Sequence, residues 1–212
     1  MSRQLFIPAI LAATLLVSCS PWTPRERKII SQSDSVMYVT VMPEDSVILR
    51  ARSIDFPPAA LASPEFRRLV DLMYRTVTDP SQDGVGIAAP QVGINRRLVW
   101  VQRFDKPGEP FEWYANIRID SLLGPVVRGP EGCLSVPPMR GIVPRSSSVV
   151  ISYASGRERV SERVEGYTAI IFQHECDHLD GILYIDRADS VFVSESWKAE
   201  REGVEYSRPE WW

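Results

Sequence analysis

The sequence predicts an α+β fold in which antiparallel β-sheets pack around a central helix that carries the motif His-Glu-x-x-His. Helical periodicity in residues 63–77, β-branched and aromatic runs at 98–101 and 149–153, and a second helical stretch near 165–181 support this prediction. Helix, strands and helix follow one another without an internal repeat, which is typical of an α+β domain. With 212 residues, 44% of them hydrophobic, the chain can bury one sizeable core.

The first predicted helix begins at Ser63-Pro64, because serine is a good N-cap and proline fits the first helical position. Asp79-Pro80 ends it, since the residue before a proline avoids helical angles. Apolar side chains recur between these limits at helical spacing and define one core-facing stripe: Phe66, Leu69, Val70, Met73, Tyr74 and Val77.

Strands are predicted at Leu98–Val101 and Val149–Tyr153, which are rich in β-branched and aromatic residues, and also at Trp113–Ile119. Prolines gather at 57–58 and across 125–144. Because proline lacks an N–H and fixes its φ angle, these two stretches are expected to be extended or turning rather than helical.

The second helix is predicted to start near Glu165–Tyr167 and to stop at Gly181, a natural C-cap. It carries His174 and His178, the only two histidines of the chain, at positions i and i+4 on one helix face. Two such imidazoles can bind one metal ion, and Glu175 can act as general base on a metal-bound water. A third protein ligand would have to be Cys, Asp or Glu. An ordinary helix with two polar histidines is the alternative.

Two further motifs contain residues suited to chemistry. Residues 84–91, Gly-Val-Gly-Ile-Ala-Ala-Pro-Gln, permit close approach of the backbone to a ligand, although a tight turn has the same composition. Residues 131–137, Glu-Gly-Cys-Leu-Ser-Val-Pro, place Cys133 in an irregular, rigid segment. Cys133 is then either a buried small hydrophobe or the missing thiolate ligand.

In this order, the three motifs Gly-x-Gly-x-Ala-Ala-x-Gln, Glu-Gly-Cys-Leu-Ser and Gln-His-Glu-x-Asp-His-Leu resemble the peptide deformylase family over roughly residues 41–186. The resemblance implies a hydrolase of bacterial protein biosynthesis that removes the N-formyl group from an initiator methionine. It also implies one divalent metal, Fe²⁺ first, with Zn²⁺ or Ni²⁺ as alternatives. By the matching positions, Cys133, His174 and His178 hold the metal, Glu175 is the base and acid, and Gln91 and the backbone N–H of Leu134 stabilise the oxyanion.

A substrate site is predicted beside the metal. Tyr167, Ile170 and Ile171 share the helix face of His174, and the family uses this apolar wall as its methionine pocket. The remaining substrate-binding candidates are loop and strand residues: Val85 and Gly86, which can pair with an extended peptide, Gly132, and Arg140. Arg140 and Arg145 both match family positions, and Arg140 either holds the substrate backbone or braces the cysteine loop through Glu131.

The N-terminus resembles a bacterial export signal. An apolar run from Leu5 to Val17 is followed by Leu-Val-Ser-Cys, similar to the lipoprotein cleavage box that leaves Cys19 lipidated. The predicted division is a signal peptide at 1–18, a tether at 19–40, the deformylase-like domain at 41–190 and a C-terminal tail at 191–212. The protein would then be lipid-anchored in the cell envelope. If the segment is an uncleaved N-terminus with an incidental cysteine, the protein is cytoplasmic.

Composition limits the partners. The net charge of −3 and the scattered basic residues argue against nucleic-acid binding. The expected partner is a formylated peptide or the N-terminus of a nascent chain, a membrane is contacted only through the lipid anchor, and the protein is expected to be a monomer. Three cysteines in unrelated contexts do not form a disulfide framework, and Cys176 is expected to serve packing.

Two competing interpretations remain. A zinc peptidase of the cell envelope would also use the His-Glu-x-x-His motif, but Tyr184 occupies the position where a metzincin has its third histidine. A gluzincin-like peptidase would need an acid such as Glu195 or Glu200, in a charged segment near the C-terminus. The non-enzymatic interpretation is an inactive envelope lipoprotein with this fold.

Overall fold

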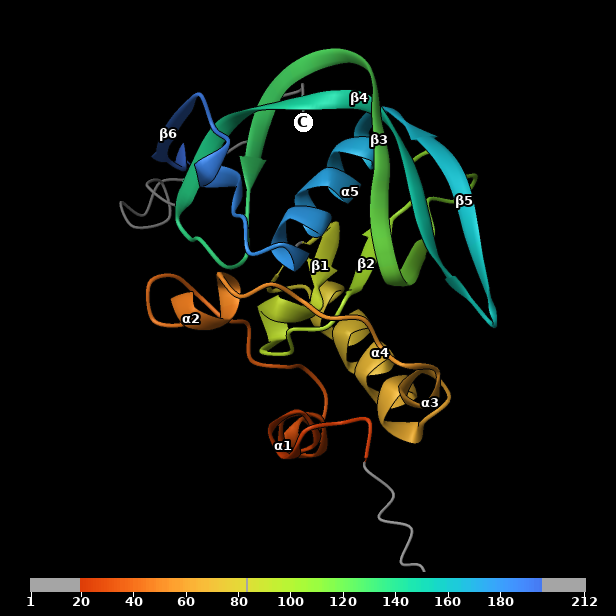
Figure 1. Ribbon diagram of the computed structural model, residues 1–212. Coiled ribbons are helices and arrows are strands. Elements are labelled where there is room, and N and C mark those ends of the chain that lie inside the picture. The colour runs from red at the N-terminus through yellow and green to blue at the C-terminus, as the bar shows by residue number, and fades with distance from the viewer. Residues whose placement is uncertain (1–19, 83, 196–212) are drawn as a thin grey trace, which may run out of the picture.

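A six-stranded antiparallel sheet forms the centre of the molecule (Figure 1), and the computed structural model describes residues 20–82 and 84–195. The strand order is β1-β2-β3-β4-β5, and β6 pairs with β4. The strands are β1 Gly86–Ala88, β2 Leu98–Gln102, β3 Phe111–Gly132, β4 Met139–Ser155, β5 Glu158–Glu165 and β6 Ser190–Val193. A mixed fold with an antiparallel sheet is therefore confirmed.

The helices are α1 Pro24–Gln32, α2 Ser46–Leu49, α3 Pro58–Leu61, α4 Pro64–Val77 and α5 Gly166–Leu179, with 3₁₀ turns η1 Ala89–Val92 and η2 Tyr184–Asp186. The Ser63 hydroxyl accepts a hydrogen bond from the Phe66 N–H at 3.2 Å, which confirms the predicted N-cap of α4. Gly181, just beyond α5, adopts a φ of 75°. Among the residues described, no helix is both long enough and apolar enough to cross a membrane.

Strand β2 separates two hydrophobic layers. Leu98 and Trp100 pack into the cluster that includes the apolar stripe of α4, whereas Val99 and Val101 pack into the cluster that includes α5. Because successive strand side chains point to opposite faces, a strand that is apolar throughout is buried on both sides. The sheet thus lies between α4 and α5.

The β3–β4 hairpin is longer than the sequence predicts. The expected strands at 113–119 and 149–153 are parts of β3 and β4, which arch over α5 in Figure 1. Register shifts interrupt their pairing at three places, and such bulges bend a hairpin. The arch returns the chain to α5, where the connection between β3 and β4 begins with Cys133.

The segment expected to be a tether at 19–40 is folded where it is described, which corrects that expectation. Trp22 is only 2% exposed, and with Ile30 and Met37 it belongs to the core cluster around α4. Thr23 and Glu26 form a reciprocal capping box that starts α1. At the other end, residues 191–193 of the expected tail belong to β6, while residues 1–19 and 196–212 lie outside the described part of the chain.

A buried ion pair joins α1 to the domain. Arg96 Nε donates to Glu26 Oε1 at 2.6 Å, and Arg96 Nη2 donates to Glu26 Oε2 at 3.1 Å. Burial alone would raise the pKa of Glu26, but the hydrogen bonds from Arg96 and Thr23 outweigh it and lower the pKa below its ordinary value. Glu26 therefore stabilises the fold as a carboxylate.

Glu26→Gln is expected to lower the free energy of unfolding by about 3 kcal/mol near pH 7, because it leaves Arg96 buried without its counter-ion. The ordinary pKa of 4.5 applies to Glu26 in the unfolded chain, and the pKa in the folded chain is lower. The stability that the Glu26 carboxylate contributes is therefore present above pH 4.5 and is lost as the pH falls through the folded-state pKa. Urea unfolding near pH 7 and near pH 3 should show the difference between variant and parent shrinking with acid. Asp71→Asn, which breaks an exposed pair with Arg75, is the control and should cost about 0.5 kcal/mol or less. An equal loss at both pH values would contradict this assignment.

Candidate metal centre and active site

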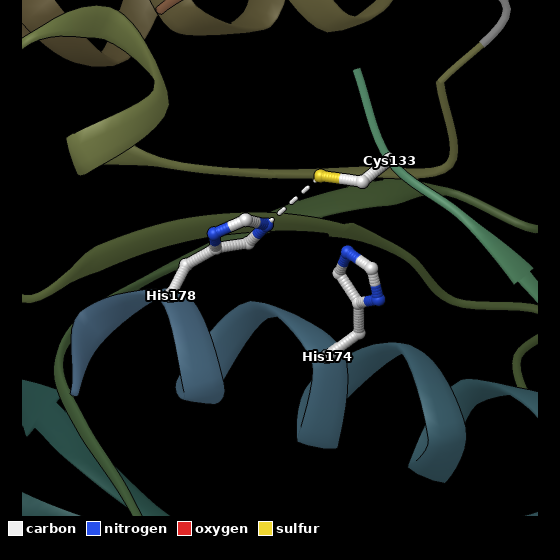
Figure 2. Close-up of side chains that lie close together, drawn as sticks. All are labelled: Cys133, His174 and His178. Carbon is white, nitrogen blue, oxygen red and sulfur yellow. Dashed lines mark hydrogen bonds between the residues drawn. The ribbon is translucent and has the colours of Figure 1, made fainter. Parts of the chain in front are cut away.

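Cys133, His174 and His178 converge above one face of α5 (Figure 2). Their ligand atoms all lie within 4.8 Å of one another, and Cys133 Sγ is 3.2 Å from His178 Nε2. The two histidines come from successive turns of α5, and Cys133 directly follows β3. The structure thus brings together the three residues that the sequence motifs single out as metal ligands.

Glu131 orients the first histidine. Its Oε2 lies 2.8 Å from His174 Nδ1. Burial would raise the pKa of Glu131, but hydrogen bonds from His174 and Arg145 outweigh it and lower the pKa to about 2. An ionised Glu131 accepts a hydrogen bond from the Nδ1–H of His174, which leaves the Nε2 lone pair of His174 for a metal.

A chain of ion pairs continues behind Glu131. Arg145 donates from Nε to Glu131 Oε1 at 2.8 Å and from Nη1 to Asp177 Oδ2 at 2.5 Å. Arg187 in turn donates from Nε to Asp177 Oδ2 at 2.6 Å. Arg145 therefore braces Glu131, a role that the sequence suggested for Arg140 as one of two alternatives. Asp177 and Arg187 were not predicted, although Asp177 lies inside the histidine motif itself.

Glu175 is packed tightly beside the backbone of β1. A Cβ atom on Gly86 would lie 2.6 Å from Glu175 Oε1 and 2.9 Å from Ile171 Cγ2, so any larger residue at position 86 would displace these side chains. Glu175 is 4% exposed, and within the described residues its Oε2 has no hydrogen-bond partner. Burial raises the pKa of Glu175 to about 7. A carboxyl group of that pKa can both take up and return a proton near neutrality.

Gln91, in η1, has its amide orientation fixed by neighbours. Its Oε1 accepts a hydrogen bond from the Ala88 N–H at 2.8 Å. Its Nε2 consequently faces Ser135 Oγ at 3.2 Å and Cys133 Sγ at 3.5 Å. A hydrogen-bond donor is thus held beside the Cys133 thiol, as stabilisation of an oxyanion near a metal requires.

A pocket of about 730 Å³ opens beside this cluster. Ile171 is buried, Ile170 is half-buried, and Tyr167 is 54% exposed with its ring 5.3 Å from that of Phe104. Apart from His178, which is buried below, the predicted ligand, catalytic and substrate-binding residues all line the pocket: Val85, Gly86, Gln91, Gly132, Cys133, Leu134, Arg140, Tyr167, Ile170, Ile171, His174 and Glu175. Cys19, the predicted lipidation residue, lies outside the described residues.

Strand β1 offers an edge to this pocket. It is the terminal strand in the order β1-β2-β3-β4-β5, and the Val85 carbonyl accepts a hydrogen bond from the Gln102 N–H at 2.8 Å on the β2 side. An edge strand can pair with an extended peptide on its other side.

The donor set fits a catalytic metal. Two imidazole nitrogens and one thiolate are three protein ligands, which leaves a coordination position for water or substrate. Tyr184, at the position of a metzincin's third histidine, stacks its ring on His174 with centroids 6.0 Å apart. Of the acids that a gluzincin-like peptidase would need, Glu195 is exposed and Glu200 lies outside the described residues. The fold and the site together define a metal-dependent hydrolase.

Comparison with known proteins specifies the family. A model of the polypeptide deformylase family matches residues 36–192. The peptide deformylase of Leptospira biflexa is 39% identical over 152 residues, covering 68% of this chain and 84% of that protein. Peptide deformylase 2 of Bordetella bronchiseptica is 42% identical over 132 residues, covering 59% of this chain and 74% of that protein.

Solved structures agree with the sequence relatives. The class I type b peptide deformylase from Acinetobacter baumannii, bound to the compound K3U, aligns with a TM-score of 0.66 and 36% identity, covering 73% of this chain and 99% of that one. The same enzyme bound to Met-Ala-Ser aligns with a TM-score of 0.62, covering 72% and 98%. The chain belongs to the polypeptide deformylase family, and its activity is that of a peptide deformylase, a hydrolase.

Proposed function

We propose that this chain removes the N-formyl group from N-formylmethionyl peptides and releases formate. The convergence of Cys133, His174 and His178 beside the buried Glu175 carries the proposal. A relative with 36% identity was crystallised with Met-Ala-Ser, a peptide that begins with methionine. These observations favour a formylmethionyl peptide over the substrates of a zinc peptidase.

Cys133, His174 and His178 would hold one divalent ion, with Fe²⁺ as the first candidate and Zn²⁺ or Ni²⁺ as alternatives, since sulfur and imidazole ligands suit these metals. The ion would polarise the formyl carbonyl and lower the pKa of a water molecule. Glu131 would keep His174 oriented toward it, and the buried Arg145 would keep Glu131 ionised.

The protein's own groups perform the proton transfers. Glu175 takes the proton of the attacking water and returns one to the nitrogen of the leaving amine, for which a pKa of about 7 is well suited. The Gln91 amide and the Leu134 backbone N–H donate to the oxygen that becomes negative in the tetrahedral state. Donors of this kind each stabilise the transition state by about 3–4 kcal/mol.

The peptide lies along the edge of β1. Its backbone pairs with Val85 and Gly86, while the methionine side chain packs against Tyr167, Ile170 and Ile171. Gly132 and Arg140 line the opposite part of the pocket, where a Cβ on Gly132 would come within 2.9 Å of the Arg140 side chain. This close packing holds Arg140 beside the path of the substrate backbone.

Formyl-Met-Ala-Ser is expected to have a kcat/KM about 10- to 150-fold above that of formyl-Gly-Ala-Ser, because full burial of a methionine side chain contributes about 1.5–3 kcal/mol. Formate release measured with both peptides tests the apolar wall. A formyl-norleucine peptide, which has nearly the same shape, is the control and should fall within a few-fold of methionine. Equal kcat/KM for the methionine and glycine peptides would show that this apolar wall does not bind the methionine side chain.

We also propose that the chain is cleaved before Cys19, carries lipid on that residue and acts in the cell envelope on formylated peptides there. The support is the apolar run ending in Leu-Val-Ser-Cys. Several acyl chains hold a protein on a membrane firmly. The ordinary alternative is a cytoplasmic enzyme that acts on nascent chains.

Cys19→Ser is expected to release the protein from the membrane fraction or leave it unprocessed, while formate release by the purified variant is unchanged because Cys19 is not part of the site. Fractionation and mass spectrometry of the native protein provide the measurement. An intact Met1 on protein from the soluble cytoplasmic fraction would overturn the proposed location and favour the nascent-chain role.

A further inference from the structure

The outer face of α1 is cationic. Arg25, Arg27 and Lys28 are exposed on this helix, whereas Glu26, its single acidic residue, is buried against Arg96. With Ile30 also buried, the helix has one face in the core and a basic face outside. Because the apolar face of α1 is buried in the protein, only its cations are available to a membrane surface, through attraction to anionic headgroups.

Arg68 of α4 extends this face. Its Nε donates to the Ile30 carbonyl at 3.0 Å and its Nη2 donates to the Ser33 carbonyl at 2.7 Å, which fixes the guanidinium at the end of α1. Arg25, Arg27, Lys28 and Arg68 are here called the basic face. Asp34 is exposed just beyond α1, and Glu65 and Asp71 lie three residues to either side of Arg68 on α4. The positive charge is therefore concentrated on α1, whose three exposed cations share the helix with one acid, the buried Glu26.

The chain is fixed to the domain almost immediately after Cys19. The Pro21 carbonyl accepts a hydrogen bond from Arg96 Nη2 at 3.0 Å, and the buried Trp22 donates from Nε1 to Ser63 Oγ at 2.9 Å. Two residues span at most about 7 Å. A lipid on Cys19 would therefore hold the start of α1 at the depth of the phospholipid headgroups, without an intervening tether.

The pocket remains accessible in that arrangement. Its lining comes from residues 82–91, 129–145 and 167–175 and from Ser194, all outside α1 and α4. In Figure 1, α1 lies at the end of the molecule opposite the arch of β3 and β4. A membrane against α1 would thus leave the β3–β4 side facing the solvent.

We propose that the basic face docks on anionic phospholipid headgroups and holds the enzyme against the membrane beside its lipid anchor. This inference rests on the lipidation of Cys19 proposed above. Guanidinium groups match the phosphate of a headgroup in geometry and charge. Each cation near an anionic membrane surface strengthens binding by about five-fold. The basic face should therefore bind such a surface by itself at low ionic strength, and a lipid that keeps it close would strengthen that binding further.

The test uses the chain from Ser20 to Trp212, which contains every described residue, and measures its co-sedimentation with vesicles at low ionic strength. Vesicles that contain phosphatidylglycerol should bind it, vesicles of phosphatidylcholine alone should not, and added salt should release it. The double variant Arg27→Gln/Lys28→Gln should bind phosphatidylglycerol vesicles about 25-fold more weakly. The control Arg157→Gln/Arg159→Gln removes the same charge from the β4–β5 hairpin and should bind like the parent.

Equal binding to both kinds of vesicle, or equal weakening in the two double variants, would overturn the proposal. A DNA duplex bound more tightly than the vesicles, and released by the same α1 variant, would assign the basic face to nucleic acid and also overturn it. Formate release by every variant in solution tests the proposed function separately. Mass spectrometry of the native N-terminus tests the lipid on Cys19. A wrong deformylase function, or a missing lipid, can therefore be told apart from a basic face that does not bind phospholipid.

Discussion

Glu175→Gln is expected to bind metal normally and to lose about 10²–10⁴-fold in kcat. Glu175 is packed closely against Gly86, since a Cβ added to Gly86 would lie 2.6 Å from Glu175 Oε1. Glutamine has the same shape and fits this space, but it cannot accept a proton. Steady-state formate release gives kcat and KM, and elemental analysis gives the metal content. Because the change affects proton transfer rather than peptide binding, KM should change little.

Glu165→Gln provides the matched control, since Glu165 is an exposed acid at the start of the same helix. It should retain the parent kcat. Near-normal turnover in Glu175→Gln would show that another group transfers the proton. A loss of metal in that variant would instead show that Glu175 contributes to binding the ion.

Cys133→Ala, His174→Ala and His178→Ala are each expected to abolish tight, stoichiometric metal binding. Each change removes one of three ligand atoms that lie within 4.8 Å of one another, and two remaining ligands make a poor site. Metal content after gel filtration, measured by elemental analysis, is the readout. Formate release should fall with the metal.

Cys176→Ala is the control for the cysteine, because Cys176 is buried in the core on the same helix and is not part of the cluster. That variant should lose some stability through the small cavity it creates but should keep its metal. Full metal retention in Cys133→Ala would contradict the ligand assignment and would reopen the peptidase alternative.

Local sequence signals predicted α4 and α5 and the residues that gather around the pocket. The stripe of α4 and its Ser63 cap depend on residues within one or two turns of each other, and so does the pair His174 and His178. Most of the predicted pocket residues lie in three short motifs or within two turns before His174 on the same helix, so each group is recognised from its neighbours in the sequence. Patterns of this kind need no knowledge of distant contacts.

Long-range contacts explain what the sequence did not show. In the sequence, residues 20–40 resemble a polar tether. In the structure they are held to the domain by hydrogen bonds from Arg96 to Glu26, 70 positions apart, and from Trp22 to Ser63. The middle of β3 is mostly exposed and contains Gly124 and Pro125, which usually interrupt strands. Its pairing with β4 overrides that local preference.

The charges behind His174 were not predicted either. Arg145 and Asp177 are buried, although such side chains are rarely buried unless they are paired, and the exposed Arg187 pairs with Asp177. Their pairing brings together β4, α5 and the end of η2, three parts of the chain whose proximity only the fold reveals. The brace behind His174 could therefore not be read from any one motif.

Anaerobic titration of the metal-free chain with Fe²⁺, with formate release from formyl-Met-Ala-Ser as the readout, tests most directly whether Cys133, His174 and His178 hold the ion on which deformylation depends. The rate should rise linearly and level off at one metal per chain, and it should stay near zero in Cys133→Ala at the same metal concentration. A metal-free chain with the full rate, or a Cys133→Ala variant that follows the parent curve, would contradict that role.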